Sequence, residues 1–228
     1  TQEVLYSHLT GQKVIGIYPL LATDQCRLLA VDFDKSDWKN CVTAFSEACL
    51  SLNIPFLVER SRSGNGAHVW IFFSEPIAAK QARLMGAGIL DKAMELYPAL
   101  DFESYDRMFP NQDHMPAGGF GNLIALPLQK HARALGNSTF IDSNFNAFTD
   151  PWTVLQQTEL MSSSEVNNIV NELGYNFIEQ NQTDVDHEAP WVKNIPKKNQ
   201  KIAGCPDAIE LVFANMIHIP IQTLPSQL

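Results

Sequence analysis

The sequence predicts an α+β fold, because a hairpin signal and amphipathic helical segments alternate within one stretch of chain. Apolar runs flank the Gly-rich turn RSGNG at residues 62–66, which is the pattern of a β-hairpin. Helical periodicity appears on both sides of it, over residues 35–53 and 78–97. A doubly wound parallel sheet would instead place a helix between successive strands.

The composition is that of a globular protein, with 45% hydrophobic and 18% charged residues among 228. The net charge of −9 excludes a protein that coats nucleic acid through its overall charge. No apolar run reaches membrane-spanning length and no leader opens the chain, so we expect a cytoplasmic location. We also expect this chain to be part of a longer polypeptide. The cysteines form no CxxC pair and are expected to be buried free thiols.

The expected elements follow in chain order. Strands are predicted over residues 13–21 and 27–34, and the helix over 35–53 begins near Ser36 or Asp37 as N-cap. The hairpin joins strands over 55–61 and 67–73, and the next helix is bounded by Pro76 and Pro98. Two further strands are predicted over 103–109 and 121–129. The character of the chain then changes, which suggests a core over residues 1–150 and a mostly helical extension with a polar linker over 151–228.

Two carboxylates end the strand over residues 27–34. Asp32 and Asp34 lie at i and i+2, so both side chains would point the same way, roughly 6–7 Å apart. Paired carboxylates at that spacing suit Mg²⁺ or Mn²⁺ and leave positions for substrate phosphates. The alternative is a strand that simply emerges into solvent.

The hairpin turn is a second candidate region. Glycines let a backbone approach phosphate oxygens, and the neighbouring polar side chains can donate hydrogen bonds to them. The residues concerned are Arg60, Arg62, Ser63, Gly64, Gly66 and His68. The alternative is an ordinary hairpin with solvated arginines and a structural histidine. The Lys-Ser/Thr pair of a P-loop is absent.

A third acid would complete a two-metal site. Asp106, in the apolar alternation SYDRMF, is the first choice, and Asp113, in the following loop, is the second. Lys130 stands where the strand over 121–129 ends and could contact phosphate or template. Any of these residues could instead belong to an exposed loop.

In this order, the motifs resemble the archaeo-eukaryotic primase superfamily: an apolar strand ending in DxD, a Gly-rich turn leading to Gly66-Ala67-His68, and then Tyr105-Asp106. The strings VDFDKSDW, ERSRSGNGAHVWIFF, YDRMFPNQD and GGFGNLIALPLQ are similar to the primase-polymerase domain of TOTE-type conflict systems. The resemblance covers residues 5–150, and more weakly the segment ELVFANMIHIP.

The resemblance implies an archaeo-eukaryotic primase fold, with an RRM-like mixed sheet packed against a second α/β unit. It implies DNA primase and polymerase activity, with dNTP or NTP as substrate, primed or single-stranded DNA as template, and a helicase region in the same polypeptide. Asp32, Asp34 and Asp106 would hold Mg²⁺ or Mn²⁺, with Asp113 as the alternative third acid. His68 would contact the phosphates of the incoming nucleotide, together with the residues of the turn and Lys130.

Two alternatives from other classes remain open. A metal-dependent nuclease or phosphoesterase could use the same acids and His68 with water as nucleophile. A non-catalytic nucleotide-binding module of a helicase protein would bind nucleotide without turnover. The sequence leaves open the choice of nucleotide, template and metal, and whether strands are started or only extended.

Overall fold

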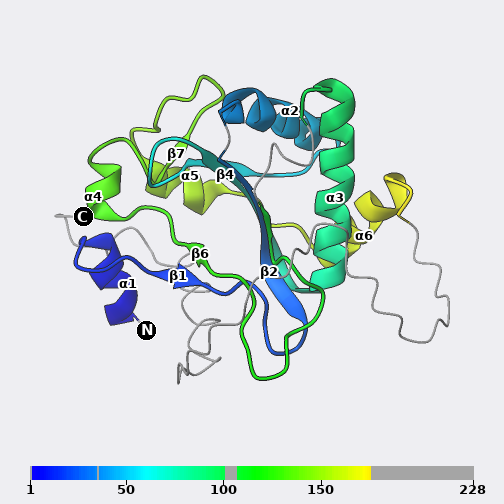
Figure 1. Ribbon diagram of the computed structural model, residues 1–228, viewed down its shortest axis with the longest axis horizontal. Helices are drawn as coiled ribbons and strands as arrows, with labels where there is room; N and C mark the ends of the chain where they lie inside the picture. The colour runs from blue at the N-terminus through cyan, green and yellow to red at the C-terminus, as the bar shows by residue number, and fades with distance from the viewer. Residues whose placement is uncertain (1, 35, 101–106, 176–228) are drawn as a thin grey trace.

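A five-stranded sheet forms the centre of the protein (Figure 1). The computed structural model describes residues 2–34, 36–100 and 107–175. The spatial order of the strands is β5 (Arg107–Phe109), β2 (Gln25–Phe33), β4 (Ala67–Ala78), β3 (Leu57–Arg60) and β7 (Thr139–Ile141). A separate two-stranded sheet pairs β1 (Gly16–Ile17) with β6 (Ile124–Ala125).

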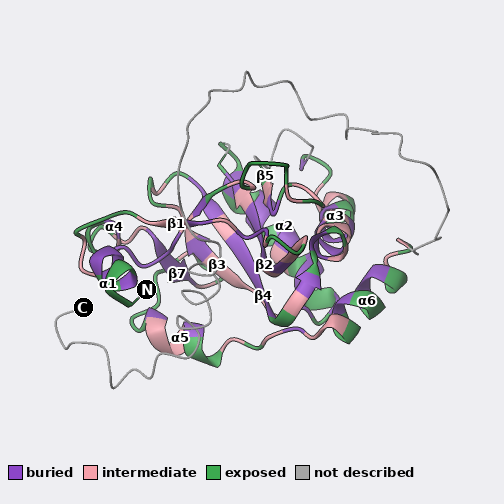
Figure 2. Ribbon diagram, turned by 90° about the horizontal axis from the view of Figure 1, so that it is seen from below, coloured by how far each residue is buried: buried purple, intermediate pink, exposed green. Residues whose placement is uncertain are grey.

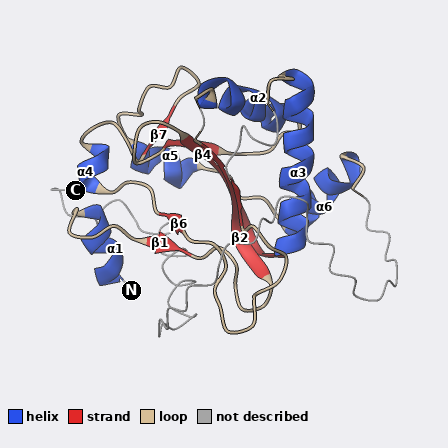
Figure 3. Cartoon of the chain, viewed as in Figure 1, coloured by secondary structure: helices blue, strands red, loops and turns tan. Residues whose placement is uncertain are grey.

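Six helices accompany these strands within the described ranges (Figure 3). They are α1 (Gln2–Leu9), α2 (Trp38–Ser51), α3 (Ala79–Leu96), α4 (Lys130–Arg133), α5 (Pro151–Gln157) and α6 (Ser163–Glu172). The α+β class, the β3–β4 hairpin and the helices predicted around it are thereby confirmed. None of these helices has the length and apolar character needed to cross a membrane.

All pairings between the described strands are antiparallel, whereas the family resemblance implied a mixed sheet. The reason lies in the order of connections. Helix α2 carries the chain from β2 to β3, and the hairpin then returns β4 into the space between them. Strands β2 and β3 therefore never become neighbours, and β4 pairs antiparallel with both.

One side of the sheet packs on helices α2, α3 and α6 (Figures 1 and 2). We call it the α3 face; β2 and β4 contribute Leu29, Val31, Phe33, Val69, Ile71 and Phe73 to it, all buried. Helix α3 approaches closely, because a Cβ on Gly86 would lie 2.9 Å from a methyl carbon of Leu29. Cys26, Cys41 and Cys49 are buried free thiols, as predicted, and Cys205 lies outside the described residues.

The other side of the sheet packs on α1, β1, β6 and α5, and we call it the α1 face. Its buried strand residues are Leu28, Ala30, Trp70, Phe72, Phe109 and Phe140. Successive side chains on a strand alternate between faces, so Asp32 and His68 continue this same row toward one end of the sheet.

The chain beyond residue 150 begins with two capped helices. Asp150 caps α5, its carboxylate accepting from the N–H groups of Trp152 and Thr153, and Ser162 and Glu165 form a capping box at α6. Val166 and Val170 of α6 are buried in the core of the α3 face. Helices α5 and α6 fall within the extension predicted over residues 151–228, whereas its remainder beyond residue 175 lies outside the described residues.

Candidate active site

Three polar side chains lie in one row across the middle strands of the sheet. Asp32 on β2 pairs directly with His68 on β4, and His68 pairs with Glu59 on β3. Arg107 on β5 stands opposite Asp32 on its other side. Directly opposed residues of antiparallel strands project to the same face, so the register brings together residues far apart in the chain.

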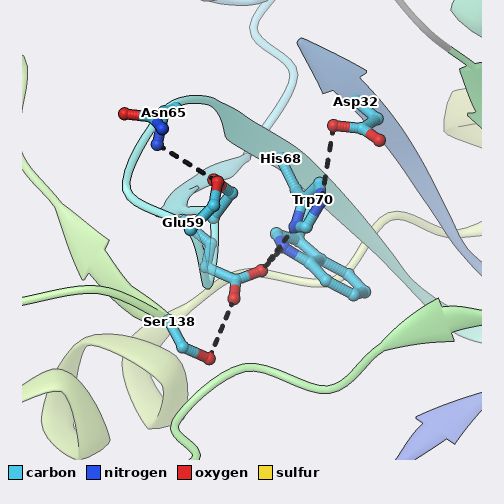
Figure 4. Close-up of polar contacts among 8 residues, drawn as sticks. Asp32, Glu59, Asn65, His68, Trp70 and Ser138 are labelled. Carbon is cyan, nitrogen blue, oxygen red and sulfur yellow. Dashed lines mark hydrogen bonds and ion pairs between the residues drawn. The ribbon is translucent and has the colours of Figure 1, made fainter. Parts of the chain in front are cut away.

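His68 lies between two carboxylates (Figure 4). Its Nδ1 is 2.9 Å from Oε2 of Glu59, and its Nε2 is 3.4 Å from Oδ1 of Asp32. The side chains of His68 and Asp32 are 13% and 16% exposed, whereas that of Glu59 is 2% exposed. The ring therefore reaches from a buried acid to a partly exposed one at the end of the sheet.

Glu59 has two further hydrogen-bond donors around it. The indole Nε1–H of Trp70 donates to Oε2 at 2.9 Å, and the Ser138 hydroxyl donates to Oε1 at 3.3 Å. The sequence did not predict a role for Glu59, although it stands at an inward position of the apolar run FLVER. An acid at an inward-facing strand position could have marked Glu59 as a residue with polar partners, since carboxylates are rarely buried without them.

The acids around His68 change the pKa of its ring. Burial by itself lowers the pKa, but the negative charge and hydrogen bond of Glu59, together with the charges of Asp32 and Asp34, raise it above its ordinary value. Protonated His68 is thus favoured beside the acids.

The β3–β4 turn packs against the end of β2. A Cβ on Gly66 would lie 2.5 Å from the carbonyl oxygen of Phe33 and 3.0 Å from Cα of Asp34. A side chain there would displace the backbone that carries Asp34. Gly64 has a φ of +80°, which glycine adopts without strain. Both glycines are therefore explained by local packing and backbone conformation.

The polar residues of the turn lie in two different places: some are exposed to solvent, and Arg60 packs on the opposite face of the sheet from Glu59. Arg62 and Ser63 are exposed, and Oγ of Ser63 accepts from the N–H of Asn65. Arg60 neighbours Glu59 on the same strand, so it projects to the opposite face, where its guanidinium donates to the carbonyl of Phe145. The structure therefore does not bring Arg60 together with His68.

Lys130 is exposed at the start of α4. The segment before Lys130 is hydrogen-bonded to Ser138, since the N–H of Leu128 donates to the carbonyl of Ser138 at 2.6 Å. Ser138 is also the residue whose hydroxyl donates to Glu59. Gln129 caps α4 with its side-chain oxygen.

Asp113 lies toward the opposite end of the sheet. It pairs with Arg83 near the start of α3, and the next residue, His114, contacts Asp24 at the start of β2. Asp24 precedes Asp32 by eight residues, which an extended strand spans in about 26 Å. The structure therefore separates Asp113 from Asp32 and Asp34.

Asp106 lies outside the described residues. The residue after it in the chain, Arg107, is the one that pairs with Asp32. Carboxylate oxygens are the donors that Mg²⁺ and Mn²⁺ prefer, so Asp32 and Asp34 fit such a cation. The described part of the chain contains no group of three or more His, Cys, Asp and Glu side chains placed to hold a metal ion.

Comparison with protein families gives a match over most of the chain. The model for the archaeo-eukaryotic primase domain of TOTE conflict systems matches residues 1–169. The match includes the DxD, the turn, His68, helix α5 and the first part of α6. Comparison with curated proteins gives no significant match.

Proposed function

The chain belongs to the archaeo-eukaryotic primase domain family of TOTE conflict systems, and from this we propose that it is a template-directed nucleotidyltransferase, a DNA primase and polymerase. The observation that carries the proposal is the pairing of Asp32 with His68 at an open end of the sheet, with Asp34 two residues further on. The substrates would be dNTP or NTP on a primed or single-stranded DNA template.

Asp32 and Asp34 would hold the divalent cations, with Asp106 as the third acid. We favour Asp106 over Asp113 because Arg107 stands opposite Asp32, whereas Asp113 pairs with Arg83 toward the other end of the sheet. Bound Mg²⁺ or Mn²⁺ would neutralise the triphosphate and stabilise the charge that develops during transfer.

The residues around His68 would bind and orient the nucleotide. The Nε2 side of His68 would face the phosphates, because Nδ1 faces Glu59, and a ring that carries both protons would donate from Nε2 to a phosphate oxygen. Arg62, Ser63 and Lys130 are exposed and could donate to the same phosphates. We assign Arg60 to holding the loop at Phe145 instead.

The reaction would form a bond between a 3′-hydroxyl oxygen and the α-phosphorus, and release pyrophosphate. The hydroxyl would come from a primer or from an initiating nucleotide. The contribution of the protein would be mainly to align the two groups, since positioning supplies much of the rate in phosphoryl transfer.

The finer features of the family are part of the same proposal. The order β5–β2–β4–β3, with helices α2 and α3 as crossovers, supports an RRM-like sheet. We further propose a second α/β unit and a helical extension over residues 151–228 that leads to a helicase region of the same polypeptide. We also propose that the protein acts in the cytoplasm, in a mobile-element or phage-defence conflict system.

The test is incorporation of labelled dNTPs or NTPs by the purified domain on primed and unprimed templates, with Mg²⁺ or Mn²⁺. The matched variants are Asp34→Asn, which keeps the shape of an exposed side chain, and the double variant Asp32→Ala/Asp34→Ala. We expect template-dependent products that both variants abolish while keeping the wild-type circular dichroism spectrum.

Other outcomes would change the assignment. Metal-dependent degradation of the template without nucleotide addition would indicate a nuclease. Nucleotide binding without turnover would indicate a binding module. An Asp34→Asn variant that keeps most of the activity would contradict the assignment of the acids.

A further inference from the structure

Glu59 is an acid held inside the sheet next to the candidate active site. Its side chain is 2% exposed, and a buried carboxylate is costly unless its oxygens are hydrogen-bonded. His68, Trp70 and Ser138 all contact it. The chain thus has a buried acid with three hydrogen-bonding partners at a position on the α1 face that an apolar side chain could have filled.

The chemistry of these partners fixes the direction of the hydrogen bonds. An indole Nε1–H can only donate, and an ionised carboxylate can only accept. Oε2 of Glu59 therefore accepts from Trp70, and its second contact, Nδ1 of His68, is satisfied when Nδ1 carries a proton. Nε2 is then the ring nitrogen turned toward Asp32.

The ring of His68 also packs against the ring of Trp70. The rings of His68 and Trp70 meet edge to face, with centroids 6.0 Å apart and an interplanar angle of 90°. Trp70 is 1% exposed and packs in the core, so it is a fixed support for Glu59. Oε2 of Glu59 thus accepts one hydrogen bond from the fixed ring of Trp70 and one from the ring of His68, which extends toward Asp32.

We propose that Glu59 is a positioning residue for His68: its carboxylate holds the Nδ1 side of the ring, so that Nε2 faces the place beside Asp32 where the triphosphate of a nucleotide would bind. This rests on the proposed function for the identity of the ligand. The assignment of the ring nitrogens does not depend on it. Replacing a partner that orients a metal-bound histidine typically costs about 10–100-fold in affinity or activity, and we expect an effect of the same order here.

The first measurement uses the wild-type protein. A long-range ¹H–¹⁵N NMR spectrum at one mildly alkaline pH, assigned by comparison with His68→Ala, reports whether Nδ1 of His68 carries a proton. We expect protonated Nδ1 in the wild type and loss of that signature in Glu59→Gln. A wild-type ring with unprotonated Nδ1 would overturn the proposal.

The second measurement is a double-mutant cycle on binding of a fluorescent dNTP analogue in the presence of Ca²⁺. We expect Glu59→Gln and His68→Ala each to weaken binding by about tenfold or more, and the double variant to bind no more weakly than His68→Ala alone. Glu59 would then act through His68. Losses that multiply would overturn the proposal, since they would mean that Glu59 acts independently of the ring.

The control is Ser138→Ala, which removes the hydrogen bond to Oε1 and leaves Oε2 and His68 in place. We expect it to keep the Nδ1 signature and most of the nucleotide binding. If Glu59→Gln fails to fold, the wild-type spectrum still decides the assignment. If no nucleotide is bound or incorporated although Nδ1 is protonated, the proposed function fails and the orientation of the ring stands.

Discussion

The two faces of the central sheet are built from alternate residues of the same strands, yet they differ in composition. On the α3 face, β2 and β4 contribute only apolar side chains to the core, up to Phe33 at the end of β2. On the α1 face the row is apolar through Ala30 and Trp70 and then changes to Asp32 and His68. One face therefore stabilises the sheet along its full length, while the end of the other carries the polar side chains of the candidate site.

The largest expected effect is on the α3 face, away from the candidate site. Phe45 of α2 is fully buried and packs edge-on against Phe33, with ring centroids 5.6 Å apart. We expect Phe45→Ala to lower the free energy of unfolding by about 3–5 kcal/mol, measured by urea denaturation.

The matched control is Leu50→Ala on the same helix, where the side chain is 65% exposed. We expect a change below about 0.5 kcal/mol there. Equal losses in the two variants would show that the α3 face does not carry the stability assigned to it.

The second-largest effect is expected for a substitution at Gly66, in the β3–β4 turn next to the end of β2. An added Cβ would lie 2.5 Å from the carbonyl oxygen of Phe33, so the backbone before Asp34 must move. We expect Gly66→Ala to cost about 1–3 kcal/mol of stability and to lower nucleotide incorporation more than Phe45→Ala does at a temperature where both are folded. An active Gly66→Ala variant would mean that the position of Asp34 is not critical.

A third effect concerns pH and the α1 face. His8 of α1 is fully buried, accepts from the N–H of Ile15 at Nδ1 and donates from Nε2 to the carbonyl of Pro127. Burial lowers the pKa of His8, an effect only partly opposed by the hydrogen bond to Pro127 and the negative charge of Glu59.

Because the pKa of His8 is lower in the folded than in the unfolded chain, the unfolded chain binds the proton first as the pH falls. The stabilisation from His8 is therefore complete above about pH 6.5 and is lost as the pH falls through the folded pKa. His68 shifts in the opposite direction, so the wild-type curve mixes both. We expect the difference between wild type and His8→Gln to shrink on acidification, measured by urea denaturation at a series of pH values. A difference that stays constant with pH would contradict the neutral, buried state of His8.

Local patterns in the sequence identified the β3–β4 hairpin, helices α2 and α3, and the acids and histidine at the strand ends. The register between strands could not be obtained in this way. Glu59 and Arg60 are neighbours, so only one of them can share a face with His68, and a shift of one residue would exchange them. Ser138 reaches Glu59 from 79 residues away. Such contacts follow from packing of the whole sheet.

The smallest expected effect is at Asp113, the second choice for the third acid. Its carboxylate pairs with Arg83, and the two side chains are 33% and 23% exposed. Because partly exposed ion pairs contribute little, we expect Asp113→Asn to cost at most about 1 kcal/mol and to leave nucleotide incorporation at the wild-type level. The parallel variant is Asp106→Asn, which we expect to abolish incorporation. If Asp113→Asn abolished activity instead, the acids would have to meet across the length of β2, and the end of the sheet that carries Asp32 and His68 could not be the whole active site.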